Sequence, residues 1–314
     1  MTHITTTALA PSLPWETASQ AGPVLLATKP FNGMDAPLAV ARWLAAREDR
    51  ELHVVTVIEQ GNSFPEAAGM PPLPPRYYDE ECAVVAVEMR RALTLDGTGT
   101  DLPHIDVLQG PPARAIVDTA RERGARVIIV GTGEHDVLGR LVYGERALQI
   151  LSLADRPVLI VPRDARAGSV ATAVVAVDFS AASLRAARAA LPMLSDGGRV
   201  KLVHVRPATT DEGELPPRRD YEYERRTEES FKQFRRQLPS LPGVTIETKL
   251  LRGDAVQTIV AYAKYYDAGL IACGRLGHSF VQRVLVGSVS SAIVRLATCP
   301  VLVAPELPGD VMVQ

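Results

Sequence analysis

The segment VLIVP, residues 158–162, returns almost unchanged as VLVAP at residues 301–305, and each copy directly follows a proline. The same offset of 143 residues aligns RVIIVG (126–131) with GLIACG (269–274) without a gap. Such self-similarity is typical of a chain built from repeated structural units. The sequence therefore predicts two similar domains in tandem.

The upstream part of the repeat fixes where the two copies begin. VLLAT (24–28) parallels VVAVD (174–178) at an offset of 150, so the first copy has about seven extra residues. They fit best in its proline-rich loop, residues 59–76. We expect a polar tail at residues 1–20, domains at 21–163 and 170–306, and a linker, RDARAGS, at 163–169.

Strand-like and helix-like segments alternate within each copy. The apolar run 174–178 is bounded by polar residues, as expected for a buried parallel strand. Segment 180–194 has apolar residues at helical spacing, and Ser180 or Ser183 can cap it. The other strands expected are 24–28, 52–57, 104–108, 127–130, 158–161, 200–205, 244–251, 270–274 and 301–305. The other helices expected are 36–47, 77–93, 113–123, 146–153, 218–238, 255–266 and 288–297. This alternation predicts an α/β fold with mostly parallel strands and helices on both faces.

The two final strands predict how the copies meet. Segments 157–162 and 300–305 would each leave an apolar strand edge exposed, which is an aggregation hazard when unpaired. We therefore expect them to lie close in space, so that one chain forms an intramolecular pseudo-dimer; a homodimer of two chains is the alternative.

Bulk composition excludes several classes of protein. The chain has 314 residues, 46% of them hydrophobic, and a net charge of −2, which gives no electrostatic case for a nucleic-acid or membrane partner. No apolar run reaches the ~20 residues of a membrane span, and the start does not resemble a secretory signal. The three cysteines form no CxxC pair, which favours buried thiols in a reducing cytoplasm.

The stretch GRLGHSFVQRVLVGSVSSAIV, residues 274–294, is the strongest candidate for a site. Gly274 follows an expected strand, whereas Gly287 and Ser288 precede an expected helix, where unpaired amide N–H groups attract anions such as phosphate. The alternative is that Gly287 and Ser288 form a plain helix cap. Asp178 ends the first strand of the same copy and suits the hydroxyls of a ribose; its alternative is also a helix cap.

The spacing G274-x2-G277-x9-G287-S288 resembles the nucleotide-binding signature of the universal stress protein family, G-2x-G-9x-G-(S/T). VVAVDFSAAS (174–183) and LLRGDAVQTIV (250–260) resemble further parts of that family, and the resemblance covers both copies. It implies two tandem Rossmann-like domains of the adenine nucleotide alpha hydrolase type, each with a five-stranded parallel sheet flanked by helices. It also implies ATP as the ligand, alone or with Mg²⁺, and dimerisation through the last strand.

Carried over by position, the resemblance assigns a set of cofactor-binding residues in the second copy. Asp178 would hold the ribose and the backbone near Val205 would meet adenine, while the glycines and serines would surround the phosphates. The complete set is Val177, Asp178, Val205, Gly274, Arg275, Gly277, Gly287, Ser288, Val289 and Ser290.

The first copy departs from this pattern. Glu134 stands where Gly277 is, Glu145 replaces Ser288 and Thr28 replaces Asp178, so two carboxylates would repel a triphosphate. Lys29 and Arg140 could offset that charge. We therefore predict that ATP binds the second copy, and the first copy weakly or not at all.

Motifs for other chemistry are missing. The sequence has no G-x4-GK-(S/T) loop, GxSxG or HExxH, and its six histidines show no metal-ligand spacing. No catalytic or metal-ligating residue is predicted. Three functions stay open: a regulatory ATP-binding module that signals to a protein partner, a weak ATPase or phosphotransfer enzyme, and a structural dimer that binds nothing.

Overall fold

The computed structural model describes residues 22–29, 34–59, 75–95, 102–132, 145–207, 217–275, 288–307 and 310. In the first copy the strands are β1 (Val24–Ala27), β2 (Leu52–Ile58), β3 (His104–Gln109), β4 (Val127–Gly131) and β5 (Val158–Val161). Its helices are α1 (Asp35–Arg47), α3 (Pro75–Leu95), α4 (Pro112–Glu122) and α5 (Glu145–Leu153). In the second copy the strands are β6 (Val170–Ala176), β7 (Leu194–Arg206), β8 (Thr245–Arg252), β9 (Leu270–Gly274) and β10 (Val301–Ala304). Its helices are α6 (Ala181–Ala190), the 3₁₀ turn η1 (Leu191–Met193), α7 (Pro217–Arg236), α8 (Ala255–Tyr265) and α9 (Ser288–Leu296).

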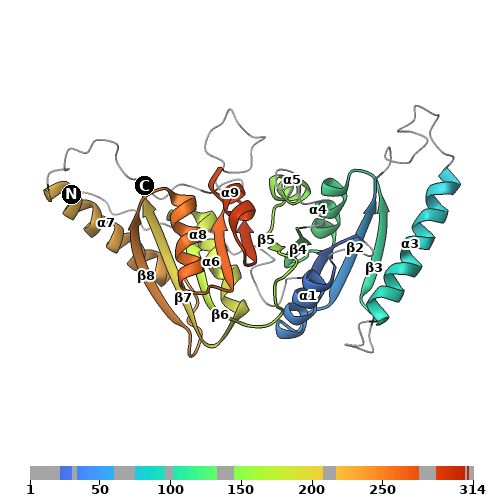
Figure 1. Ribbon diagram of the computed structural model, residues 1–314, viewed down its shortest axis with the longest axis horizontal. Coiled ribbons are helices and arrows are strands. Elements are labelled where there is room, and N and C mark those ends of the chain that lie inside the picture. The colour runs from blue at the N-terminus through green and yellow to red at the C-terminus, as the bar shows by residue number, and fades with distance from the viewer. Residues whose placement is uncertain are drawn as a thin grey trace, which may run out of the picture.

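All ten of these strands form one sheet in the order β3-β2-β1-β4-β5-β10-β9-β6-β7-β8. Pairing is parallel within each copy, and the copies join where β5 pairs antiparallel with β10. Leu159 and Leu302 are register partners at this seam. Figure 1 shows the resulting arrangement, with α3 and α7 at opposite ends of the molecule. The expected closeness of the two last strands is confirmed, and so is the fold of two tandem five-stranded α/β domains.

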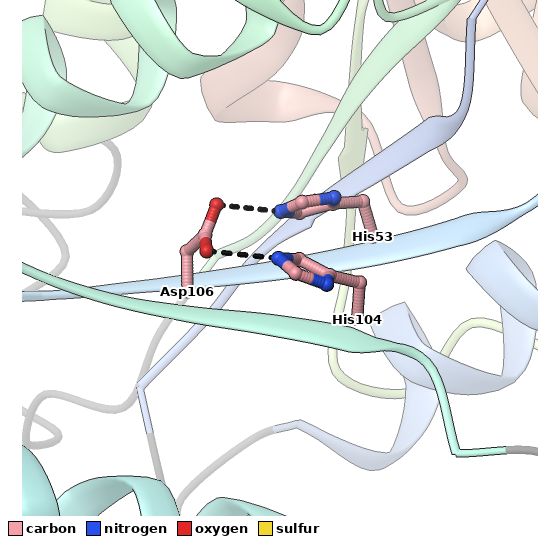
Figure 2. A group of neighbouring side chains, drawn as sticks. All are labelled: His53, His104 and Asp106. Atoms are coloured by element: carbon pink, nitrogen blue, oxygen red, sulfur yellow. Dashed lines mark hydrogen bonds and ion pairs between the residues drawn. The ribbon is translucent and has the colours of Figure 1, made fainter.

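The outer end of the sheet in the first copy carries an unusual polar group. His53 on β2 and His104 on β3 are register partners, and both side chains point to Asp106, two residues further along β3 (Figure 2). Polar side chains are normally rare inside such a sheet, because burying them costs free energy unless they are hydrogen-bonded.

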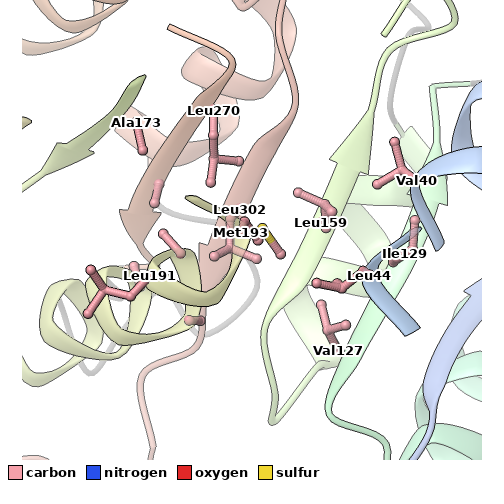
Figure 3. Close-up of a cluster of buried hydrophobic side chains, with 14 of the residues drawn as sticks. Val40, Leu44, Val127, Ile129, Leu159, Ala173, Leu191, Met193, Leu270 and Leu302 are labelled. Carbon is pink, nitrogen blue, oxygen red and sulfur yellow. The ribbon is translucent and has the colours of Figure 1, made fainter. Parts of the chain in front are cut away.

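Helices cover both faces of the sheet, and each face has a core that continues across the seam. One core joins α1 and α3 of the first copy to α6 and α7 of the second; the other joins α4 and α5 to α8 and α9. Figure 3 shows the first of these, with Leu44, Ile129 and Leu159 on one side of the seam and Met193 and Leu302 on the other. The two copies therefore share their hydrophobic cores.

Polar contacts also cross between the copies. Arg47, at the end of α1, donates from Nε to the Pro192 carbonyl at 2.8 Å and from Nη2 to the Leu194 carbonyl at 2.7 Å. A cation at a helix C terminus also suits the helix dipole. This contact ties the last turn of α1 to the start of β7.

One predicted helix is too long. The expected helix at 180–194 ends at Ala190, and Leu194 lies in β7 rather than in the helix. Pro192 explains the difference, because proline has no N–H to continue the helix and clashes with the preceding turn. The start is as expected: Ser180 is the cap and accepts from the Ser183 amide at 3.2 Å.

Candidate nucleotide site

Strand order reverses between β6 and β9 in the second copy, and ligands of open parallel sheets bind in the crevice at such a point. Ala176 and Cys273 are register partners at the ends of these two strands. Val177, just after the end of β6, and Gly274, the last residue of β9, therefore lie at the same level, followed by Asp178 and Arg275. The structure brings these four predicted residues together at one edge of the sheet.

Asp178 holds a tight turn between β6 and α6. Its Oδ1 accepts from the Ser180 amide at 3.0 Å and from the Ser180 hydroxyl at 2.6 Å. The N-cap of α6 is Ser180. Asp178 is not the cap, but its two hydrogen bonds hold Ser180 in the capping position. The Asp178 side chain is exposed, so its carboxylate lies at the surface of the switch point.

An aromatic wall, formed by Phe179, His204 and Tyr223, lies beside this turn. The His204 Nδ1 donates to the Val177 carbonyl at 2.7 Å, and its Nε2 lies 3.0 Å from the Tyr223 hydroxyl. Because a carbonyl only accepts, Nδ1 bears a proton, and in the tautomer protonated only at Nδ1 the Nε2 atom accepts from the Tyr223 hydroxyl. Phe179 packs on His204 with ring centroids 4.8 Å apart. The wall fixes the backbone at Val177, immediately before Asp178.

Phe179 has a φ of 65°, a conformation that non-glycine residues rarely adopt. Strained backbone of this kind persists only where the surrounding structure holds it. Here the edge-to-face contact with Phe231, at 5.1 Å between centroids, anchors the side chain in the core. Sequence reasoning missed this wall, since neither the φ angle nor the ring contacts leave a pattern in the sequence.

At Gly274 the backbone of β9 lies close to the start of α6. A Cβ atom at this position would lie 2.7 Å from the Ser183 amide nitrogen and 2.9 Å from the Ala182 carbonyl carbon. Real Cβ contacts are essentially never that short, and both neighbours are backbone atoms. Gly274 therefore has a packing role in addition to the ligand approach that the sequence suggests.

Arg275 connects this edge to the first copy. Its amide donates to the Ala304 carbonyl at 2.7 Å, and its guanidinium donates to the Leu151 carbonyl in α5. Burial lowers the pKa of Arg275, although the charge of Glu306 opposes this. In this structure the side chain of Arg275 serves the contact between the copies.

Val205, another predicted residue, lies half-buried near the end of β7, and the start of α9 supplies the other three that the structure describes. Ser288 is the first residue of the helix, Val289 is 39% exposed and Ser290 is buried. The first amides of a helix lack intrahelical partners, and the helix dipole is positive there. Gly277 and Gly287 lie outside the described residues, so the loop of the phosphate motif stays a prediction from sequence.

Comparison with known proteins identifies the fold. The sequence profile of the universal stress protein family matches residues 22–162 and again residues 170–305. The chain belongs to the universal stress protein family.

Individual relatives agree with this assignment. A universal stress protein of Mycolicibacterium smegmatis is 27% identical over 233 residues, which cover 71% of this chain and 77% of that protein. Universal stress protein MJ0531 of Methanocaldococcus jannaschii is 39% identical over 64 residues, which are 20% of this chain and only 38% of the relative. The crystal structure of a universal stress protein from Archaeoglobus fulgidus matches with a TM-score of 0.62 and 20% identity, over 90% of this chain and 96% of that one. At that identity the structural match shows the shared fold.

The first universal stress protein copy has a different set of charges at the corresponding edge. Arg146, in α5, pairs with Glu59 at 2.5 Å. The pKa of Lys29 is lowered, mainly by burial and to a smaller extent by the positive charge of Arg146. The negative charge of Glu59 acts in the opposite direction but does not outweigh them. The sequence predicts Lys29 at this edge but not the Arg146–Glu59 ion pair; Glu134 and Arg140 lie outside the described residues.

Among the described residues, no helix is both long and apolar enough to cross a lipid bilayer.

Proposed function

We propose that the second copy binds ATP and that the chain is a regulatory nucleotide-binding module. The observation that supports this most strongly is the meeting of Val177, Asp178 and Gly274 at the switch point between β6 and β9. The motif G274-x2-G277-x9-G287-S288 supplies the glycine loop and leads into α9. A carboxylate for the ribose and a helix N terminus for phosphate then belong to one crevice.

In this proposal six of the predicted residues contact the nucleotide. Asp178 accepts hydrogen bonds from the ribose hydroxyls, and the backbone at Val205, near the end of β7, contacts adenine. Gly277 and Gly287 let the loop approach the phosphates, while Ser288 and Ser290 offer hydroxyls and amides. The bound nucleotide is ATP or its Mg²⁺ complex, held in the domain at 170–306 rather than the one at 21–163.

The module is proposed as a binding protein that signals through occupancy, with a protein partner reading the bound state. Free cysteines suit a reducing cytoplasm: Cys82, Cys273 and Cys299 are all free thiols. Burial raises the pKa of Cys273 to about 12, so this thiol stays protonated and unreactive.

Calorimetry with ATP on the full chain tests the proposal. We expect about one ATP per chain, and loss of binding in Gly287→Glu, because a side chain and a like charge then project toward the phosphates. Gly144→Glu makes the same change at the aligned position of the first copy and should leave ATP binding unchanged. Asp178→Asn should weaken binding by about tenfold, since a hydrogen bond to a ribose hydroxyl is lost or weakened.

Two outcomes would contradict the proposal: equal ATP affinity in wild type and Gly287→Glu, or loss of binding in Gly144→Glu alone. A structurally similar universal stress protein was solved in complex with cAMP, so cAMP belongs among the competitors. Release of many phosphates per chain from Mg²⁺-ATP, if Gly287→Glu abolished it, would show that the chain is an ATPase rather than a regulatory binding module.

A further inference from the structure

Three possible metal ligands converge at the outer end of the sheet, and we call them the His-His-Asp cluster: His53, His104 and Asp106. The His53 Nε2 lies 2.8 Å from Asp106 Oδ2, and the His104 Nε2 lies 3.1 Å from Asp106 Oδ1 (Figure 2). The two imidazole rings are 4.5 Å apart between centroids. One ligand atom from each side chain can be chosen so that all lie within 4.8 Å of one another.

The fold itself does not require polar residues here, as the second copy shows. Leu25 pairs with His53, and the repeat aligns Leu25 with Val175, which pairs with Leu202. Following the same register, Thr248 takes the place of His104 and Leu250 the place of Asp106. A buried imidazole at His53, only 4% exposed, therefore stands where the same fold accepts a leucine.

We propose that the His-His-Asp cluster binds a divalent metal ion of the zinc class. Two imidazole nitrogens and one carboxylate oxygen form a donor set that suits Zn²⁺ and its borderline neighbours. Bonds of 2.0–2.2 Å in tetrahedral geometry place ligand atoms about 3.4 Å apart. The hydrogen-bonded separations, 2.8 Å to Oδ2 and 3.1 Å to Oδ1, would open by roughly 0.3–0.6 Å, and the ligand atoms that now lie up to 4.8 Å apart would move closer together. His104 is 56% exposed, so a metal has a path from solvent and a water can complete its coordination.

Arg123 is the group that competes with the metal. Its Nη2 lies 3.3 Å from Asp106 Oδ2 and 3.4 Å from His104 Nε2. The side chain is 46% exposed, so it can turn outward when a metal replaces it. Arg123 also caps the C terminus of α4, where the helix dipole favours a cation.

The cluster is separate from the proposed nucleotide site. His104 is the first residue of β3 and His53 the second residue of β2, so both lie at the starting ends of strands in the first copy. The nucleotide residues follow the carboxyl ends of strands in the second copy. A test of metal binding at the His-His-Asp cluster is therefore independent of whether the second copy binds ATP.

Titration of chelator-treated full-length protein with Co²⁺ tests this site, since Co²⁺ reports four-coordinate geometry through intense visible absorption. We expect one Co²⁺ per chain, displaced by Zn²⁺, and a higher melting temperature with Zn²⁺. His104→Gln should weaken Co²⁺ binding by more than about 100-fold and remove the absorption, because a direct ligand is lost. Arg123→Gln should bind at least as tightly as wild type, because it removes a competing cation.

The opposite responses of His104→Gln and Arg123→Gln separate a metal site from an ion cluster that only stabilises the fold. Asp106→Asn is the second ligand variant and should behave like His104→Gln, with circular dichroism checking that each variant folds. A wild-type chain without the visible bands would overturn the proposal. So would bands that persist unchanged in both ligand variants, because the metal would then lie elsewhere.

Discussion

Replacing Gly274 by alanine tests a close approach between strand β9 and helix α6 in the second copy. The added Cβ would lie 2.7 Å from the Ser183 amide nitrogen and 2.9 Å from the Ala182 Cβ. Ordinary van der Waals contact begins near 3.4 Å, so the start of α6 would have to recede by about 0.7 Å.

The expected cost follows from how firmly both neighbours are held. β9 pairs with strands on both sides, and α6 packs with Ala186 and Ala190 fully buried, so neither element can yield freely. Overpacking of this kind costs roughly 1–3 kcal/mol, and backbone neighbours favour the upper half of that range. The lower unfolded-state entropy of alanine returns up to about 1 kcal/mol. We expect Gly274→Ala to lower the free energy of unfolding by about 2 kcal/mol.

Gly269→Ala, immediately before the same strand, is the matched control. Its Cβ would meet Val170 Cγ1 at 3.1 Å, and the end of a side chain can turn away, so the expected cost is under about 1 kcal/mol. Urea denaturation of the three proteins measures both changes, provided that the m-value stays constant. If Gly274→Ala proves no less stable than Gly269→Ala, the packing role of Gly274 is refuted.

Two further predictions concern the seam and a charge cluster. Leu159→Ala removes a side chain that is 1% exposed and is the register partner of Leu302 across the seam. We expect the free energy of unfolding to fall by about 2–4 kcal/mol and the backbone amides of β10, in the second copy, to exchange faster with solvent. Faster exchange in the first copy alone would contradict a shared core. Burial alone would raise the pKa of Asp155, but its bonds to Arg156 and Arg121 outweigh this and hold the pKa below its usual value. The resulting stability is present above the unfolded pKa of about 3.9 and is lost as pH falls through the folded pKa. At pH 7 we expect Asp155→Asn to have a free energy of unfolding about 1–2 kcal/mol lower than wild type. Urea denaturation below about pH 4 should show a smaller difference between the two proteins, and a difference that does not change with pH would contradict this prediction.

The fold could be predicted because its signals are local. Strands β1, β5 and β10 are buried along their whole length, so each reads as an uninterrupted apolar run between turns. The repeat then shows that one order of elements occurs twice. The prediction was wrong at Leu194. Leu191 and Leu194 have helical spacing, but Pro192 ends the helix between them, and Leu194 is the first residue of β7.

The candidate site was only partly visible in the sequence. Asp178 and Gly274 were predictable neighbours, because the ends of adjacent parallel strands meet at one edge. The guanidinium of Arg275 was not, since its partner Leu151 is 124 residues away. His53 and His104 were missed for a similar reason: their closeness depends on the register of β2 and β3, not on spacing along the chain.

Two consecutive residues connect the proposed nucleotide site to the seam. Gly274 ends β9 at the switch point, and the next amide, that of Arg275, donates to Ala304 on the strand that pairs with β5. The Arg275 guanidinium then donates to Leu151 of the first copy. A ligand can shift an equilibrium only through contacts that differ between two states. If ATP binds as proposed, its phosphate loop begins at the residue that bonds both copies, so a change in loop position alters the contact with α5. In that case the first copy, whose motif residues differ, would supply in α5 the surface that responds to a nucleotide bound in the second copy.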